Sequence, residues 1–228
     1  LENRARPLMD IIAGIRGSAS LIDHGLENDN YQLVRDAWPI LQRSNNKISS
    51  LVQDMLTYSK DREPELQKAH LNELADEIYQ MMATSAAEMG CIFDIDLDEK
   101  MPWSLFDRER LHDAVLNIVS NALQASQDQT MARVLISTRF DPDRKRTCIA
   151  IEDNGPGISE EISSKIFEPF FSTKGSKGTG LGLAVTQKVV REHGGDIDLK
   201  SAPDEGACFT IWLPLREPTE EEQTATGS

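Results

Sequence analysis

A glycine-rich stretch directly before an apolar run limits the possible folds of this chain more than any other feature. Gly178-Thr-Gly-Leu-Gly-Leu183 leads into an apolar run that includes Val185, Val189 and Val190, whose spacing predicts an amphipathic helix. Glycine allows close approach of the backbone to a ligand, and a helix N-terminus offers N–H groups to an anion. The stretch therefore predicts a phosphate-binding loop, with a plain helix-capping turn as the alternative.

A second motif ends a predicted buried strand. Thr147-Cys-Ile-Ala-Ile-Glu-Asp153 is rich in apolar residues, and the Asn154-Gly155 and Pro156-Gly157 pairs after it predict a turn. The Asp153 carboxylate can accept a hydrogen bond from the exocyclic amine of a nucleotide base in a largely apolar pocket. Gly155 and Gly157 would leave room beneath that base. An ordinary turn would contain the same residues, so this motif alone has middling specificity.

Two asparagines on one helix form the third motif. Apolar residues at helical spacing predict a helix over residues 108–127, and Asn117 and Asn121 lie four apart on its half-buried face. Magnesium prefers oxygen ligands and needs only one or two from the protein, which the amide oxygens could supply. A capping or core hydrogen-bonding role is the alternative for this pair.

With these motifs in this order, residues 70–215 resemble the ATP-binding catalytic domain of sensor histidine kinases, within the GHKL superfamily. The residues of the F box and the G2 box are most similar to those of the nitrogen-regulation type of sensor kinase. The resemblance implies an α/β sandwich of the GHKL (Bergerat) type with a mobile lid. The matching segments are the N box (117–124), the G1 box (153–157), the F box (167–174), the G2 box (178–182) and the closing strand (206–214).

The resemblance implies ATP and Mg²⁺ as cofactors. Asp153 would bind the adenine amino group, and Asn121 would be the principal Mg²⁺ ligand with Asn117 beside it. Gln124 would face the phosphates, where many relatives carry a basic residue. The other implied ATP-binding residues are Gly155, Gly157, Ile158, Lys174, Gly178, Thr179, Gly180, Leu181, Gly182 and Thr210.

The implied lid runs from Ile158 to Thr179. Lys174 is its candidate phosphate contact, and Phe170 or Phe171 would anchor it, with simple core packing as the alternative for one of them. In the gyrase and chaperone branches the position of Asn117 holds a glutamate that activates water. An amide cannot act as a general base at neutral pH, so the resemblance favours phosphate transfer or ATP holding over hydrolysis.

The first 65 residues contain two runs with helical apolar spacing, separated by a break at residues 25–30. Asp29 or Asn30 is a plausible N-cap for the second run, which contains Pro39. An isolated helical hairpin cannot bury both apolar faces, so we expect a homodimeric four-helix bundle. This arrangement matches the dimerisation and phosphoacceptor domain of histidine kinases.

The histidine of that domain is missing here. Aligning the family pattern on Gly14-Ile-Arg-Gly17 puts Arg6 at the position of the histidine and Asp10 at the following Asn or Thr position. Aligning on Pro7-Leu8 instead puts Glu2 at the position of the histidine. We prefer the first alignment because it keeps the apolar spacing. The histidines present are His24, His70, His112 and His193, and none is placed like a phosphoacceptor.

The expected fold is therefore α+β, with a helical hairpin at 1–65, an ATP-binding domain at 66–216 and a disordered acidic tail at 217–228. Within the domain we expect one mixed sheet with helices on one face. Its remaining elements are helix 71–89, strand 91–97, connection 102–107, a hairpin of 134–140 with 147–152, and a hairpin of 196–201 with 208–213.

Composition narrows the partners and the compartment. The net charge of −14 argues against nucleic acid and anionic membrane surfaces, and no run approaches the ~18 apolar residues of a membrane span. The odd number of cysteines, in apolar runs, suggests reduced thiols in the cytoplasm. The chain would act there by itself or as the cytosolic part of a larger sensor, with a response-regulator receiver domain or another signalling protein as its partner.

Three hypotheses remain open from the sequence. The first is a dimeric sensor-kinase core that binds Mg·ATP and would be defective in self-phosphorylation. The second is a nucleotide-binding pseudokinase that regulates a partner through its hairpin. The third is a kinase that acts on serine or on the histidine of another protein.

Overall fold

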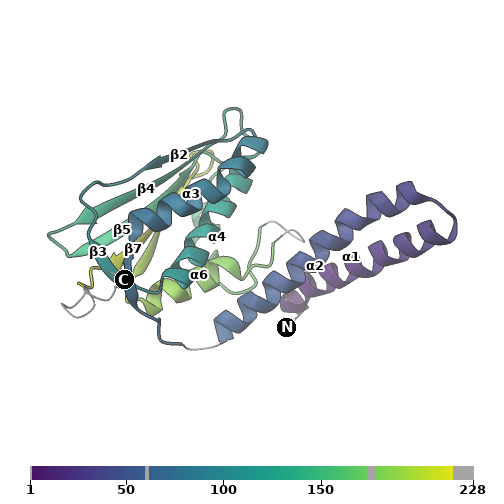
Figure 1. Cartoon of the computed structure of the whole chain (residues 1–228), viewed down its shortest axis with the longest axis horizontal. Helices are drawn as coiled ribbons and strands as arrows, with labels where there is room; N and C mark the ends of the chain where they lie inside the picture. Colours follow the sequence, from purple (N-terminus) through teal and green to yellow (C-terminus); the bar gives the residue numbers. More distant parts are fainter. Residues whose placement is uncertain (1, 60–61, 174–177, 218–228) are drawn as a thin grey trace, which may run out of the picture. The chain divides into compact units, whose positions relative to one another are not determined.

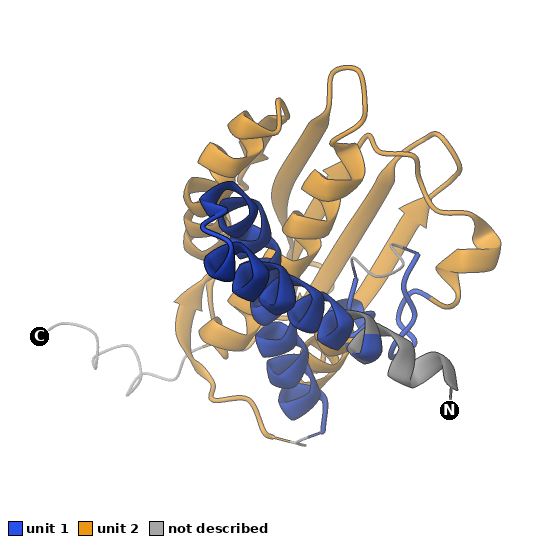
Figure 2. Cartoon of the chain, turned by 90° about the vertical axis from the view of Figure 1, so that its right-hand side faces the viewer, with its two compact units in different colours: residues 1–60, 166–184 blue, residues 61–165, 185–228 orange. Residues whose placement is uncertain are grey.

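The computed structural model describes residues 2–59, 62–173 and 178–217, and for residues 2–8 and 10 it describes the backbone alone. The chain forms two compact units, which Figure 2 colours separately. The first unit contains residues 1–60 and 166–184, and the second contains residues 61–165 and 185–228. The first unit therefore combines the N-terminal segment with part of the predicted lid.

Two long helices make up most of the first unit. α1 spans Glu2–Glu27 and α2 spans Tyr31–Ser59, and Figure 1 shows them lying side by side as a hairpin. The Asn30 side chain accepts a hydrogen bond from the Leu33 N–H at 3.2 Å, which satisfies a free donor at the start of α2. The predicted hairpin and one of its two candidate N-caps are thus confirmed.

A mixed sheet forms the centre of the second unit, with five strands in the order β2–β4–β5–β7–β6. β2 runs parallel to β4, and the other neighbouring strands pair antiparallel. This confirms the mixed sheet and both predicted hairpins. The strands are β2 (Ile92–Asp96), β4 (Arg133–Asp141), β5 (Arg146–Asp153), β6 (Asp196–Ser201) and β7 (Ala207–Pro214).

Helices cover one face of this sheet in Figure 1: α3 (Leu71–Glu88), α4 (Arg108–Ser126) and α6 (Gly182–Glu192). Burial alternates along β7, where every second residue from Ala207 to Leu213 is buried. Because strand side chains alternate between faces, this pattern directs one set into the core beneath the helices. A short helix, α5, spans Glu160–Ser163.

A second, two-stranded sheet corrects the prediction of a single sheet. β1 (Gln67–His70) pairs antiparallel with β3 (Trp103–Phe106), so the predicted connection over residues 102–107 contains a strand. Each strand has only four residues, which is too short for alternation to be distinguished from a loop, and its partner lies far away in the chain. Among the described residues, no helix is both long and apolar enough to cross a membrane.

Candidate functional site

Asp153 ends β5 and is almost completely buried, with 7% of its surface exposed. Its Oδ1 accepts a hydrogen bond from the Gly155 N–H at 2.8 Å. Burial raises the pKa of the Asp153 carboxyl above its ordinary value, and the N–H groups of Gly155 and Ala207 oppose that rise. The strand end therefore carries a desolvated carboxyl that is held by backbone donors and suits a strong hydrogen bond from a ligand amine.

Hydrogen bonds join the turn after Asp153 to the end of β6 and to the turn that follows β6. The Ile158 N–H donates to Ser201 Oγ at 2.8 Å, and the Asp204 N–H donates to the Pro156 carbonyl at 2.8 Å. Gly157 has φ +70°, and a Cβ there would lie 1.9 Å from the Ala202 carbonyl oxygen. Sequence reasoning explained this glycine by the room that a base needs; the structure adds a neighbouring backbone that leaves no room for a side chain.

Asn117 and Asn121 both lie half-buried on α4, as the predicted helix required. The Asn117 side-chain N–H₂ donates to Thr186 Oγ1 of α6 at 3.1 Å. With its nitrogen engaged in this way, the Asn117 amide has its oxygen left for a ligand. An amide oxygen is a suitable ligand for Mg²⁺, so the residues present fit that ion.

Gln124 and Thr210 lie less favourably. The exposed Gln124 donates from Nε2 to Ser120 Oγ at 3.1 Å, on its own helix. Thr210 pairs with Ala150 in the register of β5 and β7, and it alternates with the buried residues of β7. Its side chain is therefore on the opposite sheet face from Asp153, and the structure does not bring these two predicted site residues together.

The predicted phosphate loop lies in the first unit. Leu181, which is 1% exposed, packs with Ile11 of α1 and Leu51 of α2, and Phe170 packs against the same cluster. Thr179 Oγ1 donates to Asp54 Oδ2 at 3.4 Å. This packing agrees with the core-packing alternative for Phe170, whereas its role as lid anchor stays a prediction.

A backbone hydrogen bond joins the predicted lid to the glycine-rich stretch. The Phe170 N–H donates to the Gly180 carbonyl at 2.8 Å. Gly180 has φ +68°, and a Cβ there would lie 2.6 Å from the Phe170 carbonyl carbon. A side chain at position 180 would therefore push the backbone at Phe170 away from the backbone at Gly180. This steric limit explains the glycine without reference to a ligand.

Several predicted positions lie outside the described residues. Lys174 is one, and the side chains of Arg6, Asp10 and Glu2 are others, although their backbone belongs to α1. Sequence reasoning in turn missed Thr186, which contacts Asn117. A lone hydroxyl within a periodic apolar run is the signal that could have identified it.

The helix-covered mixed sheet has the architecture of the GHKL class of ATP-binding domains, and comparison with known proteins gives the family. Residues 106–217 match the family described as histidine kinase-, DNA gyrase B- and HSP90-like ATPase. The chain is 33% identical over 211 residues to the signal transduction histidine-protein kinase AtoS of Escherichia coli, covering 92% of this chain and 34% of AtoS. It is 30% identical over 223 residues to the sensory histidine kinase/phosphatase NtrB of Rhodobacter capsulatus, covering 94% of this chain and 61% of NtrB.

Solved structures agree with these relatives. The catalytic domain of histidine kinase ThkA matches with a TM-score of 0.60 and 30% identity, covering 67% of this chain and 99% of that domain. ThkA in complex with response regulator protein TrrA matches with a TM-score of 0.70 and 26% identity, covering 90% of this chain and 60% of that chain.

The chain belongs to the protein histidine kinase family and carries its ATP-binding catalytic domain. It spans 34% of the length of AtoS and 61% of that of NtrB.

Proposed function

We propose that this chain is a Mg·ATP-binding core of a two-component sensor histidine kinase. The observation that carries the proposal is the buried Asp153 carboxyl, held by the Gly155 N–H at the end of β5. A desolvated carboxylate accepts a hydrogen bond from an adenine amine more strongly than a solvated one. Asn121, with Asn117 beside it, would ligate the Mg²⁺ that neutralises phosphate charge.

The residues around the ion favour transfer or retention of phosphate over its hydrolysis. Asn117 is an amide, which cannot take a proton from water at neutral pH, and its nitrogen is occupied by Thr186. The contribution of α4 is then to orient the polyphosphate, while a separate acceptor would have to receive the phosphoryl group.

The acceptor is the part in which this chain departs from its family pattern. Arg6, or Glu2 in the alternative alignment, occupies the histidine position, and neither side chain is a suitable nucleophile there. The histidine of the hairpin is His24, which lies near the end of α1. Its Nδ1 lies 3.1 Å from Asn28 Nδ2. We infer that the chain does not phosphorylate itself on the usual helix position.

This absence of an imidazole at position 6 supports a second candidate function. The chain would bind nucleotide as a pseudokinase and regulate a partner through its hairpin, or it would phosphorylate a partner protein. Either role keeps the nucleotide site and dispenses with a phosphoacceptor in the chain.

Incubation with γ-labelled ATP separates these functions. Label on the chain supports self-phosphorylation, and its loss in His24→Gln would identify His24 as the acceptor. Label found only on an added partner protein, on serine or histidine, supports a kinase of partner proteins. Tight ATP binding without label supports the pseudokinase, and Arg6→His should then produce label on the chain. Absence of ATP binding in the presence of Mg²⁺ would overturn the proposed function.

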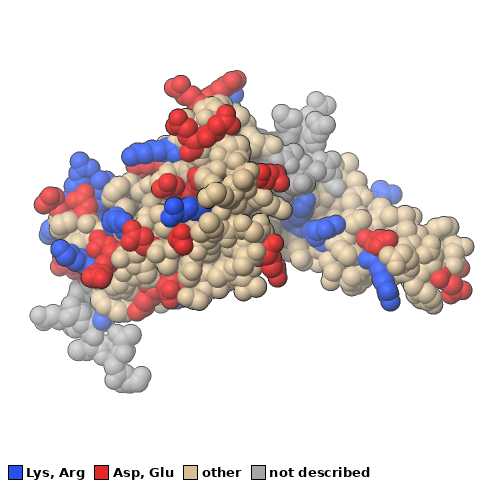
Figure 3. Space-filling view, turned by 90° about the horizontal axis from the view of Figure 1, so that it is seen from above, with Lys and Arg blue, Asp and Glu red and all other residues tan. Residues whose placement is uncertain are grey.

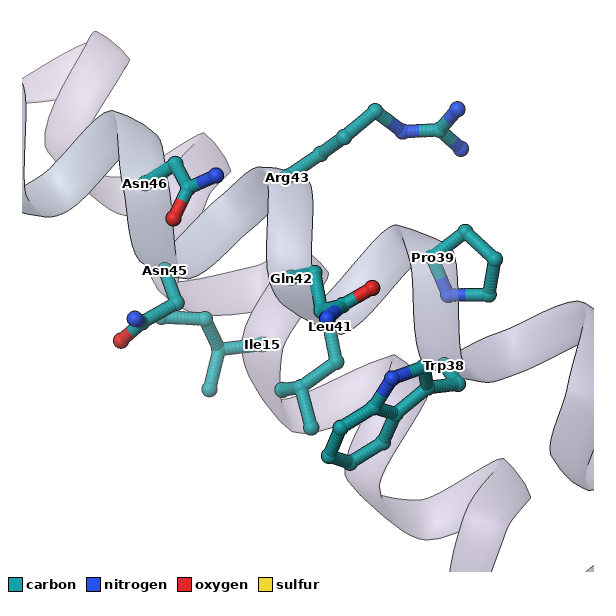
Figure 4. Close-up of a pocket in the computed structure, with 8 residues that line it drawn as sticks. All are labelled: Ile15, Trp38, Pro39, Leu41, Gln42, Arg43, Asn45 and Asn46. Atoms are coloured by element: carbon teal, nitrogen blue, oxygen red, sulfur yellow. The ribbon is translucent and has the colours of Figure 1, made fainter.

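The surface of the hairpin favours a homodimer through residues 1–65. Several large apolar side chains of the two helices are exposed, and the hairpin end in Figure 3 shows wide uncharged areas. A groove on the hairpin has a volume of about 660 Å³. Figure 4 shows Trp38 and Leu41 of α2 near Ile15 of α1 in its lining. The exposed set includes Met9, Ile12, Leu21, Leu26, Tyr31, Trp38, Ile40, Val52, Met55, Leu56 and Tyr58.

A second copy that packs its hairpin on these residues would bury them in a four-helix bundle. Light scattering should give about twice the chain mass, and Trp38→Asp should reduce it to one chain mass. A monomeric wild-type chain at micromolar concentration would contradict the dimer.

The proposed partner is a response-regulator receiver domain, because ThkA has been solved in complex with the response regulator protein TrrA. The proposed compartment is the cytoplasm, where ATP is available and where Cys91, Cys148 and Cys208, all free in the structure, stay reduced.

A further inference from the structure

Thr186 is a buried polar residue on a helix face that is otherwise apolar. It lies on α6, is 1% exposed, and has the buried Val189 and Val190 in the next turn. Burying a hydroxyl without a hydrogen-bond partner costs free energy, so we expect the Thr186 hydroxyl to be hydrogen-bonded inside the fold. Its contacts lie on α4, and both belong to the turn that carries Asn117.

The direction of these hydrogen bonds is set by what each group can do. Thr186 Oγ1 lies 3.4 Å from the Ala114 carbonyl oxygen, which can only accept. The single hydroxyl hydrogen is therefore used toward Ala114, and the hydroxyl oxygen is left to accept. The Asn117 group 3.1 Å away must then donate, so it is the N–H₂.

Fixing the nitrogen of an amide also fixes its oxygen. A free asparagine side chain can turn its amide over and present either a donor or an acceptor to a ligand. In this chain, turning the amide over would place the Asn117 oxygen next to the Thr186 oxygen. The Thr186 hydroxyl could then donate to only one of the two acceptors, Asn117 or Ala114, so one of its two hydrogen bonds would be lost. The amide is consequently held with its oxygen away from Thr186.

We propose that Thr186 is a positioning residue that orients the Asn117 amide oxygen toward the divalent cation on the ATP phosphates. This inference rests on the proposed function, because it needs Mg·ATP at α4. Thr186 lies one turn beyond Gly182 on α6, so the helix that follows the glycine-rich loop also orients the ligand on α4. The role of Thr186 is indirect, since it acts through Asn117.

Two substitutions at one position separate the hydroxyl from the packing. Thr186→Val keeps the shape and removes the acceptor, whereas Thr186→Ser keeps the hydroxyl. The Mg²⁺ concentration needed for half-maximal ATP binding should rise about tenfold or more in Thr186→Val, as is typical when the partner of a metal ligand is lost. It should keep the wild-type value in Thr186→Ser.

ATP binding in excess EDTA is the internal control. It depends on the base contact at Asp153 and should be equal in the wild type and both variants. A loss of EDTA-resistant binding in Thr186→Val would indicate general damage to the site, and would overturn a role restricted to orienting Asn117. If Thr186→Val fails to fold, Thr186→Ala replaces it in the same titration.

A readout without nucleotide tests the hydrogen bond itself. The side-chain amide signal of Asn117, assigned by its loss in Asn117→Ala, should shift in Thr186→Val and stay in place in Thr186→Ser. An unmoved signal together with a wild-type Mg²⁺ titration in Thr186→Val overturns the inference. Failure of the wild type to bind Mg·ATP would instead overturn the proposed function, while a shifted amide signal would still show the Thr186 contact.

Discussion

At the scale of single residues, the fold buries a carboxyl group at a position where its ionisation is unfavourable. Asp153 is buried at a strand end, and its backbone donors only partly offset the loss of water. Its carboxyl has a raised pKa in the folded state, so it stabilises the empty fold most at pH below the ordinary value, and that contribution is lost as pH rises through the folded pKa. A fold that holds an ionised Asp153 at neutral pH thus gives up stability at this position in exchange for a strong acceptor.

Asp153→Asn should weaken ATP binding about 10- to 150-fold, corresponding to about 1.5–3 kcal/mol for a hydrogen bond to a charged group. Calorimetric titration measures the change, and circular dichroism should show an unchanged fold. Glu152→Gln is the matched control, because the adjacent side chain is exposed on the other sheet face. Equal ATP affinity in Asp153→Asn and the wild type would refute the assignment of Asp153.

Asn121→Ala should abolish the dependence of ATP binding on magnesium, since the principal protein ligand of the ion would be removed. Titration with and without EDTA measures that dependence. Gln127→Ala is the control, because Gln127 is an exposed residue at the C-terminal cap of the same helix. A variant that responds to magnesium like the wild type would show that the ion is held elsewhere.

At the scale of elements, described residues on either side of positions 174–177 pack with the helical hairpin in one compact unit. Leu181 enters the apolar cluster of Ile11 and Leu51, and Thr179 donates to Asp54. Burial raises the pKa of the Asp54 carboxyl, while its hydrogen bond from Thr179 lowers it. Residues predicted to hold phosphates therefore also have partners on α1 and α2.

Asp54→Ala should loosen the glycine-rich loop, because Thr179 loses its acceptor. The loss of about 0.5–1 kcal/mol for one hydrogen bond should speed hydrogen exchange of residues 178–181 about two- to fivefold in the nucleotide-free protein. Asp54→Asn keeps an acceptor oxygen and should exchange like the wild type. Unchanged exchange in Asp54→Ala would mean that the apolar cluster alone holds the loop.

At the scale of the whole molecule, a buried histidine connects distant parts of the second unit. His193 is 2% exposed; its Nδ1–H donates to the Val189 carbonyl at 2.7 Å, and its Nε2 accepts from the Asp107 N–H at 3.0 Å. The Arg216 guanidinium donates to the His193 carbonyl at 3.0 Å. His193 is therefore a neutral core residue that joins α4, α6 and the chain after β7.

The stability of the protein should consequently fall in mild acid. Burial lowers the pKa of His193 below its ordinary value of 6.5, so the unfolded chain takes up a proton that the folded imidazole resists. The stabilisation is complete above about pH 6.5 and is lost as pH falls through the folded pKa, with a slope of at most about 1.4 kcal/mol per pH unit. Urea unfolding between pH 7.5 and about 5 measures this slope.

His193→Gln should flatten the dependence of unfolding free energy on pH in that range, at the expense of lower stability at pH 7.5. His24→Gln is the control, because His24 lies on the hairpin and has an exposed environment. An equally steep slope in His193→Gln would assign the acid sensitivity to other groups.

The sequence by itself determined the elements whose signal is local. Periodic apolar residues predicted α4 and the β4–β5 and β6–β7 hairpins to within one or two residues, and the order of the three motifs identified the ATP-binding domain. These features depend on spacing along the chain, which is visible in a single sequence. The assignment of Arg6, or of Glu2 in the alternative alignment, to the phosphoacceptor position is likewise a prediction from the sequence.

Only the tertiary structure decided which distant residues meet. It paired β1 with β3, joined Thr186 to Asn117, and separated Thr210 from Asp153 by placing them on opposite sheet faces. Spacing along the chain reports burial, because burial repeats with the helix or strand. A hydrogen-bond partner or a short paired strand repeats nothing along the chain, so it becomes known only when the distant segments are packed together.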